Sequence, residues 1–487
     1  MNRKRKNTMK QRTIIFLSLI FNFAFGYETR LFQEIDFFSE KYQKYDVGYN
    51  LFDFSGNPAL MKSAYQKNID LYQFSGGKNI NSYHRYYDSE RTENLELNLN
   101  WVRQLGTKSL LATGVRYQHS YLINVERSLE KNYYDHYFGF TDTTNGDITY
   151  QGPRLFILYN RNINENLLWG LEINYGVERG LKDIYTECET IMRDMDASLG
   201  LGYFSDDKNT IIGLSARYFN RQAKYEAVKY YLDAVVKTWM GYHLYMPEVP
   251  RSTNRKNDDR EGYDLGIQIE QKQLLGTNFG IRLSGNFGEH KNDIEVGSPS
   301  NTKARGYWQR QASQYFANLF YKSDKIEGHF YFIHLSRWDW AKPKTYEVLA
   351  LENEVKEIRL GGILNLQMTE KITAMGGFEF VSENRSYDEY AANYKFSNTM
   401  NSSLLTLGGL FALNPITVFS VRGHYGISEP DFHWPDTDRF AIMGGKFGVS
   451  RQFVYVKLDI DLNYSLLKPN NSDKQNEVFG INITFQR

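Results

Sequence analysis

The sequence predicts an all-β protein: a single transmembrane antiparallel up-and-down β-barrel of about eighteen strands, with fourteen or sixteen strands as alternatives. Three observations carry this prediction. Apolar and polar residues alternate in many segments, short polar turns alternate with longer connections, and an alternating segment ends the chain. Strict alternation places apolar side chains on one face of a strand and polar side chains on the other. In a membrane barrel these two faces meet lipid and a polar lumen.

Residues 1–26 predict a secretory signal peptide. Six basic residues precede an apolar run at residues 14–25, and small residues stand before the expected cleavage site. An uncleaved anchor is the alternative, but the run is shorter than the ~20 apolar residues of a membrane span. The mature chain is expected to begin near Tyr27. Because Cys188 is the only cysteine, no lipid-anchored cysteine is expected after the cleavage site.

The composition favours a membrane barrel and disfavours a nucleic-acid partner. Tyr and Phe total 69 residues, which suits strands and aromatic girdles. Mean hydropathy is -0.56, but hydropathy scales miss barrel strands because half of their residues are polar. Removing the six basic residues of the signal from 58 Lys and Arg leaves 52 against 57 Asp and Glu, a net charge of -5. No strong basic field attracts nucleic acid.

Residues 27–67 are expected to form an N-terminal, plug-like hatch outside the barrel wall. They lack clean alternation and are crowded with Phe, Tyr, Asp and Glu. A barrel of about eighteen strands leaves an aqueous hole unless loops or a terminal segment fill it. A flexible periplasmic tail is the alternative, although a disordered tail would not normally carry so many aromatic residues. The barrel is expected to occupy residues 68–487.

The strands of the predicted barrel have one apolar and one polar face. Residues 95–101, 169–177 and 454–464 show the clearest alternation. Each has charged or amide side chains on its polar face, where a dry core would make them costly. Residues 477–485 alternate in the same way, and Phe485 lies two residues from the end of the chain. Such a final strand is typical of outer-membrane barrels.

Short and long connections alternate strictly along the chain. A soluble β-sandwich has no such asymmetry between its two ends, so the pattern favours a transmembrane barrel. An even strand count would place both termini in the periplasm. The short turns are predicted at residues 104–108, 162–166, 205–209, 273–277, 323–325 and 368–371. The long extracellular connections are predicted at residues 122–150, 222–260, 289–312, 339–354 and 383–402.

One of these connections, residues 222–260, also has a helical pattern. Val228, Leu232, Val235 and Trp239 recur at helical spacing with charged residues between them. An amphipathic helix that acts as a lid or ligand groove is one interpretation. A structured surface loop, or a strand extended beyond the bilayer, is the other. Cys188 is expected in a different loop, with no particular role.

Charged residues of both signs are predicted to face the lumen, and neither sign dominates. Opposed charges across a lumen can orient polar solutes and set ion selectivity, or they can pair with one another and hold the wall together. Six residues are the strongest candidates for lining a path: Arg116, Glu172, Asp264, Arg282, Asp459 and Asp461.

No constellation of residues predicts catalysis or a metal centre. The nine histidines are scattered, and the sequence has no glycine-rich phosphate loop, paired cysteines or HExxH helix. The best local cluster of hard ligands is Asp431, His433, Asp436 and Asp438, for which a plain turn is the favoured interpretation. No catalytic residue, metal or cofactor is expected.

Two tryptophans, Trp338 and Trp340, flank Asp339 at a predicted strand end. Anchoring in an interfacial aromatic girdle is the ordinary role for tryptophans at such a position. A more specific interpretation is that the same two tryptophans form a platform on which a carbohydrate stacks.

The segment from Phe52 to Leu60, which contains Asn57, Pro58 and Ala59, resembles the Asn-Pro-Ala sequence near the mature N-terminus of FadL-like outer-membrane transporters of hydrophobic compounds. The chain as a whole resembles outer-membrane barrels of Bacteroidota. The FadL-like resemblance implies a gating hatch at Asn57 and Pro58 that folds into the lumen, with diffusion of apolar ligands through the barrel. That family has fourteen strands and a more apolar lumen than the alternation indicates here.

The predicted function is passive, gated transport of small solutes or hydrophobic compounds across the outer membrane of a Gram-negative bacterium, without cofactor or covalent chemistry. The expected partners are outer-membrane lipid, lipopolysaccharide and the barrel-assembly machinery. A non-conducting docking or accessory barrel of an uptake or secretion complex is the alternative, and a barrel-embedded hydrolase is a remote one. Nucleic acid is not an expected partner.

Overall fold

A computed structural model of the chain describes most residues beyond position 55. The predicted signal peptide and most of the predicted hatch lie outside the described residues. The described residues are 56–61, 68–131, 133–135, 137–182, 186–229, 236–246, 253–344, 348–431, 433–434 and 437–487.

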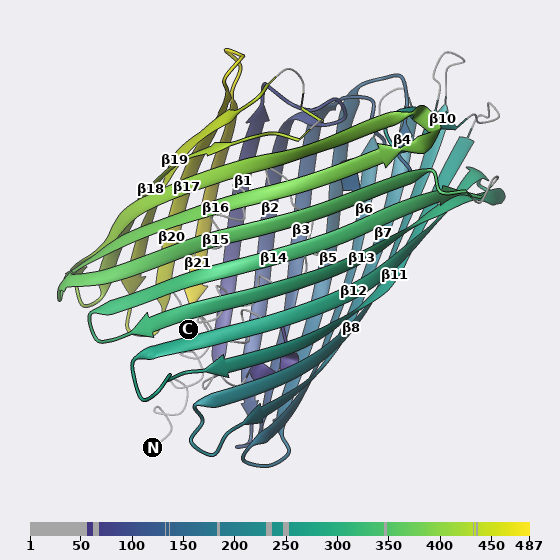
Figure 1. Cartoon of the computed structure of the whole chain (residues 1–487). Coiled ribbons are helices and arrows are strands. Elements are labelled where there is room, and N and C mark those ends of the chain that lie inside the picture. Colours follow the sequence, from purple (N-terminus) through teal and green to yellow (C-terminus); the bar gives the residue numbers. More distant parts are fainter. Residues whose placement is uncertain are drawn as a thin grey trace, which may run out of the picture.

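The chain folds as a closed antiparallel barrel of eighteen strands, which confirms the predicted fold class and strand count (Figure 1). The barrel closes because β1 pairs with β2 on one side and with β21 on the other. Its strands are β1 (Ile69–Asn81), β2 (Ser89–Leu105), β3 (Ser109–Val125), β5 (Gly146–Asn162), β6 (Leu167–Lys182), β7 (Thr186–Phe204), β8 (Thr210–Lys229), β11 (Thr253–Gln271), β12 (Phe279–Ser298), β13 (Asn301–Lys322), β14 (Ile326–Pro343), β15 (Leu351–Thr369), β16 (Ile372–Glu389), β17 (Tyr394–Asn414), β18 (Thr417–Ser428), β19 (Phe440–Gln452), β20 (Lys457–Pro469) and β21 (Asn476–Gln486).

Only short elements lie outside the wall of the barrel. Three strands, β4 (Phe140–Thr141), β9 (Lys237–Met240) and β10 (Leu244–Met246), form a small separate sheet. Single 3-10 turns occur at η2 (Pro58–Leu60), η3 (Tyr133–Asp135) and η4 (Tyr390–Ala392). No helix in the described part of the chain is long and apolar enough to cross a membrane.

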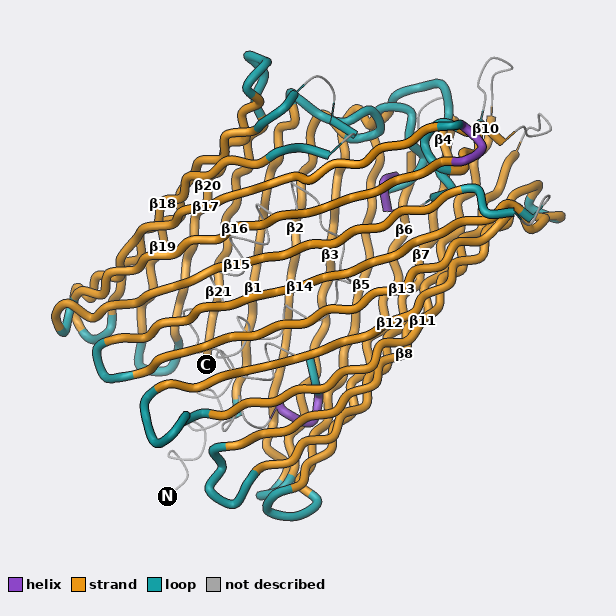
Figure 2. Tube along the Cα trace, in the orientation of Figure 1, coloured by secondary structure: helices purple, strands orange, loops and turns teal. Residues whose placement is uncertain are grey.

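The two ends of the barrel differ, as Figure 2 shows. At one end, which we call the turn end, β1 begins, β21 finishes and every connection is short. The six predicted turns are all present there, and two further turns occur at residues 415–416 and 453–456. The second of these shortens a predicted strand, because β20 begins at Lys457 rather than at Val454. We call the opposite end the loop end.

At the loop end, all five predicted long connections are wrong in extent and three of them are short, so the predicted strict alternation of short and long connections is wrong as well. Residues 289–312 are mostly strand, with only residues 299–300 between β12 and β13, and the other two connections shrink to residues 344–350 and 390–393. These segments are polar, but their outward side chains alternate with buried inward ones, so strands continue through them. The connections between β3 and β5 and between β8 and β11 are long, as predicted.

The predicted amphipathic helix is also wrong where the structure describes it. Val228 belongs to β8 and Trp239 to β9, while Leu232 and Val235 lie outside the described residues. Cys188, expected in a loop, is buried in β7. Val228, Trp239 and Cys188 pair with neighbouring strands. The structure of a segment in a sheet depends on such partners more than on its local sequence pattern.

An apolar belt surrounds the barrel on its turn-end half. We define it by the exposed, outward-facing apolar side chains between two rings of aromatic residues. On β12 the belt runs from Phe279 to Phe287, nine residues, within the ~9–11 that a transmembrane strand needs. The border nearer the turn end includes Tyr203, Phe279, Phe411 and Phe485. The border nearer the loop end includes Tyr175, Tyr218, Tyr263, Tyr315 and Tyr425.

Beyond the belt, one side of the barrel continues toward the loop end as a projecting wall. We use this name for the loop-end halves of β7, β8 and β11 to β17. Strand β13 has 22 residues, about twice what a bilayer crossing requires. The outward side chains of the wall are mostly charged or amide groups, including Glu289, Lys291 and Asp293. The wall therefore presents a polar surface outside any lipid that covers the belt.

Candidate functional site

The Asn-Pro-Ala segment lies in the lumen near the turn end, where the side chain of Asn57 is fully buried. We call residues 56–61 the latch. Pro58 begins the short 3-10 turn, and the Asn57 Oδ1 atom accepts a 3.0 Å hydrogen bond from the Ala59 amide. A proline in the first position and an asparagine before it are the residues that such a turn prefers. The local sequence therefore shapes the latch by itself.

The Asn57 amide fastens the latch to the wall. Its Nδ2 atom lies 3.1 Å from the Leu201 carbonyl oxygen, 3.0 Å from that of Leu214 and 2.9 Å from Gln268 Oε1. These groups lie on β7, β8 and β11. On the other side, the Asn160 side chain donates to the carbonyl oxygen of Pro58 at 3.2 Å. One side chain thus ties the latch to three neighbouring strands.

Glycines in the wall make room for the latch. A Cβ atom at Gly200 would lie 2.0 Å from Asn57 Oδ1, and one at Gly170 would lie 2.4 Å from the Pro58 carbonyl carbon. At Gly213 a Cβ would meet Asn57 Nδ2 at 2.8 Å. No side chain larger than hydrogen fits between backbone and latch at Gly170 or Gly200. The wall is therefore shaped for this segment.

An apolar cluster completes the latch contacts. Leu60 and Met61 are buried against Leu110, Ala112 and Leu158, which point inward from β3 and β5. The same buried cluster continues onto β1, β2 and β8, and inward apolar residues near the turn end of several strands are the signal by which the sequence could have located this contact. Burying a leucine-sized side chain contributes about 1.5–3 kcal/mol.

All six residues predicted to line the lumen lie on the faces opposite to the apolar belt. No two of them are paired with each other. Asn174 donates a 2.8 Å hydrogen bond to Glu172, whereas the remaining five form ion pairs. The pairs are Arg116 with Glu96, Asp264 with Arg217 at 3.5 Å, Arg282 with Glu270 at 2.5 Å, Asp459 with Lys457 at 3.0 Å, and Asp461 with Lys446 at 3.3 Å. Asp264 also forms a 3.2 Å hydrogen bond with the His290 ring.

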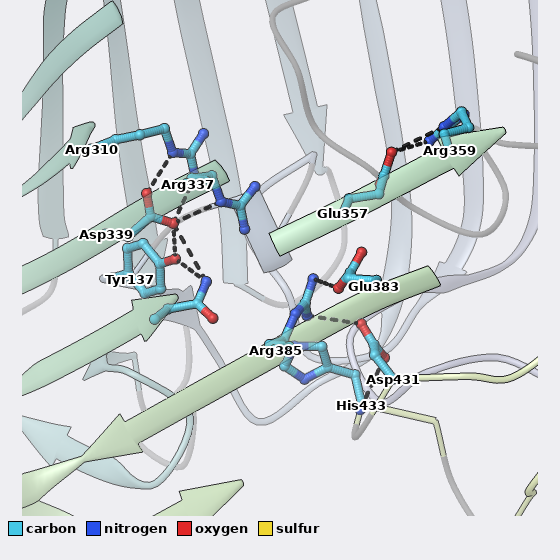
Figure 3. Close-up of polar contacts among 11 residues, drawn as sticks. Tyr137, Arg310, Arg337, Asp339, Glu357, Arg359, Glu383, Arg385, Asp431 and His433 are labelled. Carbon is cyan, nitrogen blue, oxygen red and sulfur yellow. Dashed lines mark hydrogen bonds and ion pairs between the residues drawn. The ribbon is translucent and has the colours of Figure 1, made fainter. Parts of the chain in front are cut away.

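A second set of lumen charges comprises Arg359, which alternation predicts to face the lumen, and four residues that the sequence analysis missed, Arg310, Arg337, Asp339 and Glu357. Asp339 is fully buried and accepts from Arg310 Nε at 2.7 Å, with Arg337 Nε at 3.1 Å (Figure 3). One strand away, Arg359 pairs with Glu357 at 2.8 Å. Asp339 was assigned to an extracellular loop, so the alternation that places it inward was overlooked. These pairs lie on β13 to β15.

At the loop end, loops from different parts of the barrel pack together in an aromatic cluster. We call the described residues of connections 126–145 and 236–246 the lid. Tyr134 of the lid packs on the Arg85 guanidinium, 4.2 Å from the ring centroid, and its ring centroid lies 4.6 Å from that of His433. Tyr242 lies 4.4 Å from the same histidine ring. The lid therefore spans the mouth and meets the β1–β2 and β18–β19 loops.

The lid is fastened to the projecting wall by buried polar groups. The Tyr137 hydroxyl donates to Asp339, and the Asn353 side chain donates to Tyr137 Oη at 2.8 Å. Lys256, fully buried on β11, donates to both the Glu130 carboxyl group and the Phe138 carbonyl oxygen. The groups on the lid side and on the wall side are both buried, so undocking the lid would break these hydrogen bonds and expose the groups to water.

The cluster around Asp431 holds loops together. Asp431 pairs with Arg385 at 3.3 Å and accepts a 3.1 Å hydrogen bond from the His433 amide (Figure 3). Asp436 lies outside the described residues, and Asp438 is exposed to solvent. Within the described ranges, no three His, Cys, Asp or Glu side chains are placed to hold a metal ion.

The lid is expected to dock more weakly as the pH rises. Burial raises the pKa of Glu130 to about 7 from its ordinary 4.5, against the opposing effect of Lys256. The docked lid thus holds a proton that the undocked lid releases between pH 4.5 and 7. Docking is therefore strongest below pH 4.5 and weakens as the pH rises through 7. Each unit of pKa difference is worth about tenfold in the docking equilibrium.

Cys188 provides a native reporter for this change, because it is buried beneath Leu129 and Phe140 of the lid. Maleimide labelling of Cys188, divided by the rate in unfolded protein at the same pH, should increase about tenfold or more from pH 5 to pH 8. The Glu130→Gln variant should show a nearly flat ratio. An equally steep ratio in that variant would exclude Glu130 as the titrating group.

No protein-family model and no curated protein matches the chain. Among solved structures, the chain is similar to the ferric yersiniabactin uptake receptor FyuA from Yersinia pestis, at 9% identity over 87% of this chain and 81% of that chain (TM-score 0.48). It is also similar to BauA, the ferric preacinetobactin receptor from Acinetobacter baumannii (8%, 87% and 80%, TM-score 0.45). A third is the TodX monoaromatic hydrocarbon channel (11%, 88% and 92%, TM-score 0.33). Such distant likenesses say nothing about what this chain binds or conducts.

Proposed function

We propose that the chain is an outer-membrane barrel that conducts small polar solutes passively and is gated by two closures in series. The observation that carries the proposal is a lumen lined by many charged and amide side chains, with the latch bound inside it near the turn end and the lid packed against several loops and strands at the loop end. An eighteen-strand wall is wide enough for an aqueous channel. The latch occupies one end and the lid spans the other. Each is held by contacts that a few side chains provide.

The apolar belt supports a place in the outer membrane. Exposed apolar side chains between two aromatic rings match the surface that membrane barrels present to lipid and to lipopolysaccharide. Single-chain barrels of this kind keep short turns in the periplasm and longer loops outside. The turn end and both termini would then be periplasmic, and the lid and projecting wall would face the cell surface. Delivery to the membrane would require the barrel-assembly machinery.

The charges of the lumen favour polar solutes over hydrophobic compounds. Arginine and carboxylate side chains alternate around the inner face, for example Arg217 with Asp196 at 2.9 Å and Arg154 with Asp194 at 2.5 Å. An apolar solute would have to displace water from these groups without replacing its hydrogen bonds. Paired charges of both signs can orient dipolar or zwitterionic solutes. We infer no covalent chemistry and no cofactor.

Planar-bilayer conductance of four refolded proteins tests the two closures. They are the mature chain, a variant without residues 27–67, a variant with residues 127–143 replaced by a short turn, and the combination of both changes. The intact chain should be nearly silent because both closures are in place. Each single variant should open briefly, and the combined variant should conduct steadily with the largest amplitude.

Two outcomes would contradict the proposal. Steady conductance of the intact chain, equal to that of the combined variant, would show that neither segment gates the lumen. Silence of the combined variant, with the barrel folded, would exclude passive transport. The second result would favour a docking or accessory barrel, for which the polar projecting wall offers a surface.

A further inference from the structure

An aromatic shelf lies on the outer surface of the projecting wall. Its rings are Tyr307 on β13 and Trp338 and Trp340 on β14, and Trp338 is 39% exposed. The ring centroids of Trp338 and Trp340 are 6.3 Å apart, and those of Tyr307 and Trp340 are 5.6 Å apart. The three rings therefore form one continuous patch on the outer face of two adjacent strands.

Polar side chains flank the rings in the register of the sheet. Trp338 stands between Gln311 on β13 and Glu354 on β15, and Trp340 stands between Gln309 and Glu352. All of these positions share the outward face, because the register pairs them side by side. Each indole thus has an amide on one side and a carboxylate on the other.

The shelf lies above the apolar belt. Tyr315 and His334 are register partners at the belt border, and Trp338 and Trp340 follow four and six residues later on β14. At ~3.3 Å per residue these steps are about 13 and 20 Å along the strand. A strand tilt of ~35–45° converts them to about 9–16 Å of height.

This height distinguishes the shelf from a lipid-anchoring girdle. The interfacial layer adds only ~5–8 Å to each side of the hydrocarbon core, so Trp340 stands outside it. The belt border already has its own ring of tyrosines, including Tyr218 and Tyr263. The girdle interpretation of Trp338 and Trp340 therefore does not fit their position.

We propose that the shelf binds the saccharide portion of an outer-leaflet glycolipid. The C–H faces of a pyranose ring pack on the flat, electron-rich faces of indole and phenol rings. The flanking amides can donate and accept hydrogen bonds, and the carboxylates can accept them. Together these groups can form hydrogen bonds with the hydroxyls of a bound sugar. Glu354 pairs with Lys356 at 2.6 Å, and Lys342 lies 5.0 Å from the Trp340 ring centroid, so charges of both signs surround the rings. The proposal rests on the loop end facing the cell surface, but not on conduction through the lumen.

Titration calorimetry of the full mature chain in detergent tests the shelf. The probe is lipid-free core oligosaccharide released from lipopolysaccharide by mild acid. The Trp338→Ala/Trp340→Ala variant should bind at least tenfold more weakly than the parent protein. Trp340→Phe, which keeps a flat ring, should retain most of the affinity. Trp169→Ala is the matched control, since Trp169 faces outward at the opposite border of the belt.

The variants must first show the heat-dependent electrophoretic shift of a folded barrel. Equal affinity of the double variant and the parent protein would overturn the proposal. Failure of the parent protein to bind the lipid-free saccharide while it binds intact glycolipid would also overturn it, since acyl chains would then carry the contact. Bilayer conductance of the double variant should equal that of the parent, so this test and the test of gating fail independently.

Discussion

Gly200→Ala is expected to expel the latch from the lumen without disturbing the wall of the barrel. The new methyl group would lie 2.0 Å from Asn57 Oδ1, a separation that no Cβ atom tolerates. The backbone of β7 is held on both sides by β6 and β8, so the latch must move. Asn57 would lose the hydrogen bonds that its two Nδ2 hydrogens share among three acceptors of the wall, each bond worth about 1 kcal/mol. A total of about 2 kcal/mol corresponds to a ~30-fold shift toward the undocked latch.

Trypsin cleavage after Lys62, which follows the latch in the sequence, measures this shift. The Gly200→Ala variant should be cleaved there about 30-fold faster than the parent protein, and Asn57→Ala should be cleaved at least as fast, because it removes the same hydrogen bonds and the one from the Ala59 amide. Gly77→Ala is the matched control, because its Cβ would meet nothing closer than a carbonyl oxygen at 3.4 Å. Equal cleavage rates in the Gly200→Ala and Gly77→Ala variants would show that the glycine does not hold the latch.

Asp339→Asn is expected to cause the largest loss of stability of any single substitution on the projecting wall. The carboxylate is fully buried and faces Arg310, Arg337 and Tyr137. An asparagine keeps the shape of the side chain but removes the negative charge that the Arg310 and Arg337 guanidinium groups face. Removing one partner from a buried ion pair typically costs 3–5 kcal/mol. We expect a decrease of about that size in the free energy of unfolding, measured by urea denaturation in lipid vesicles.

Tyr137→Phe separates the role of the lid from the stability of the wall. This variant loses only the hydroxyl that joins the lid to Asp339, while the two arginine pairs remain. The free energy of unfolding should fall by only about 1 kcal/mol, and labelling of Cys188 should become faster. If Asp339→Asn and Tyr137→Phe reduced the free energy of unfolding equally, the arginine pairs would contribute nothing to the wall.

Alternation along the sequence was sufficient to predict the barrel. Its period of two is a local property of each strand, and it fixes which residues face outward wherever the strand is paired. For this reason the strand count agrees with the structure, and Glu172, Arg282 and Asp461 lie opposite to the belt. The same rule also applied to residues 289–312, but their polarity was taken as evidence of a loop. A polar outward face on a strand that leaves the bilayer has the same composition as a loop.

The contacts that close the lumen could not be read from the sequence. Asn57 and Gln268 are 211 positions apart, and Tyr137 and Asp339 are 202 positions apart. In each pair, the sequence around one residue carries no local pattern that predicts the other residue. The glycine at position 200 also looks like any other small residue in a strand until the latch lies against it.

The sequence by itself determined the all-β class, a count of about eighteen strands, six of the eight short turns and the inward face of the six charged residues predicted to line the lumen. These features follow from the two-residue period of a strand and from turn chemistry, both of which act over a few neighbouring residues. Only the tertiary structure decided the extent of the projecting wall, the position of the latch, the contacts that hold the lid and the height of the aromatic shelf above the belt. These depend on strand register and on contacts between distant segments, which exist only once the barrel has closed.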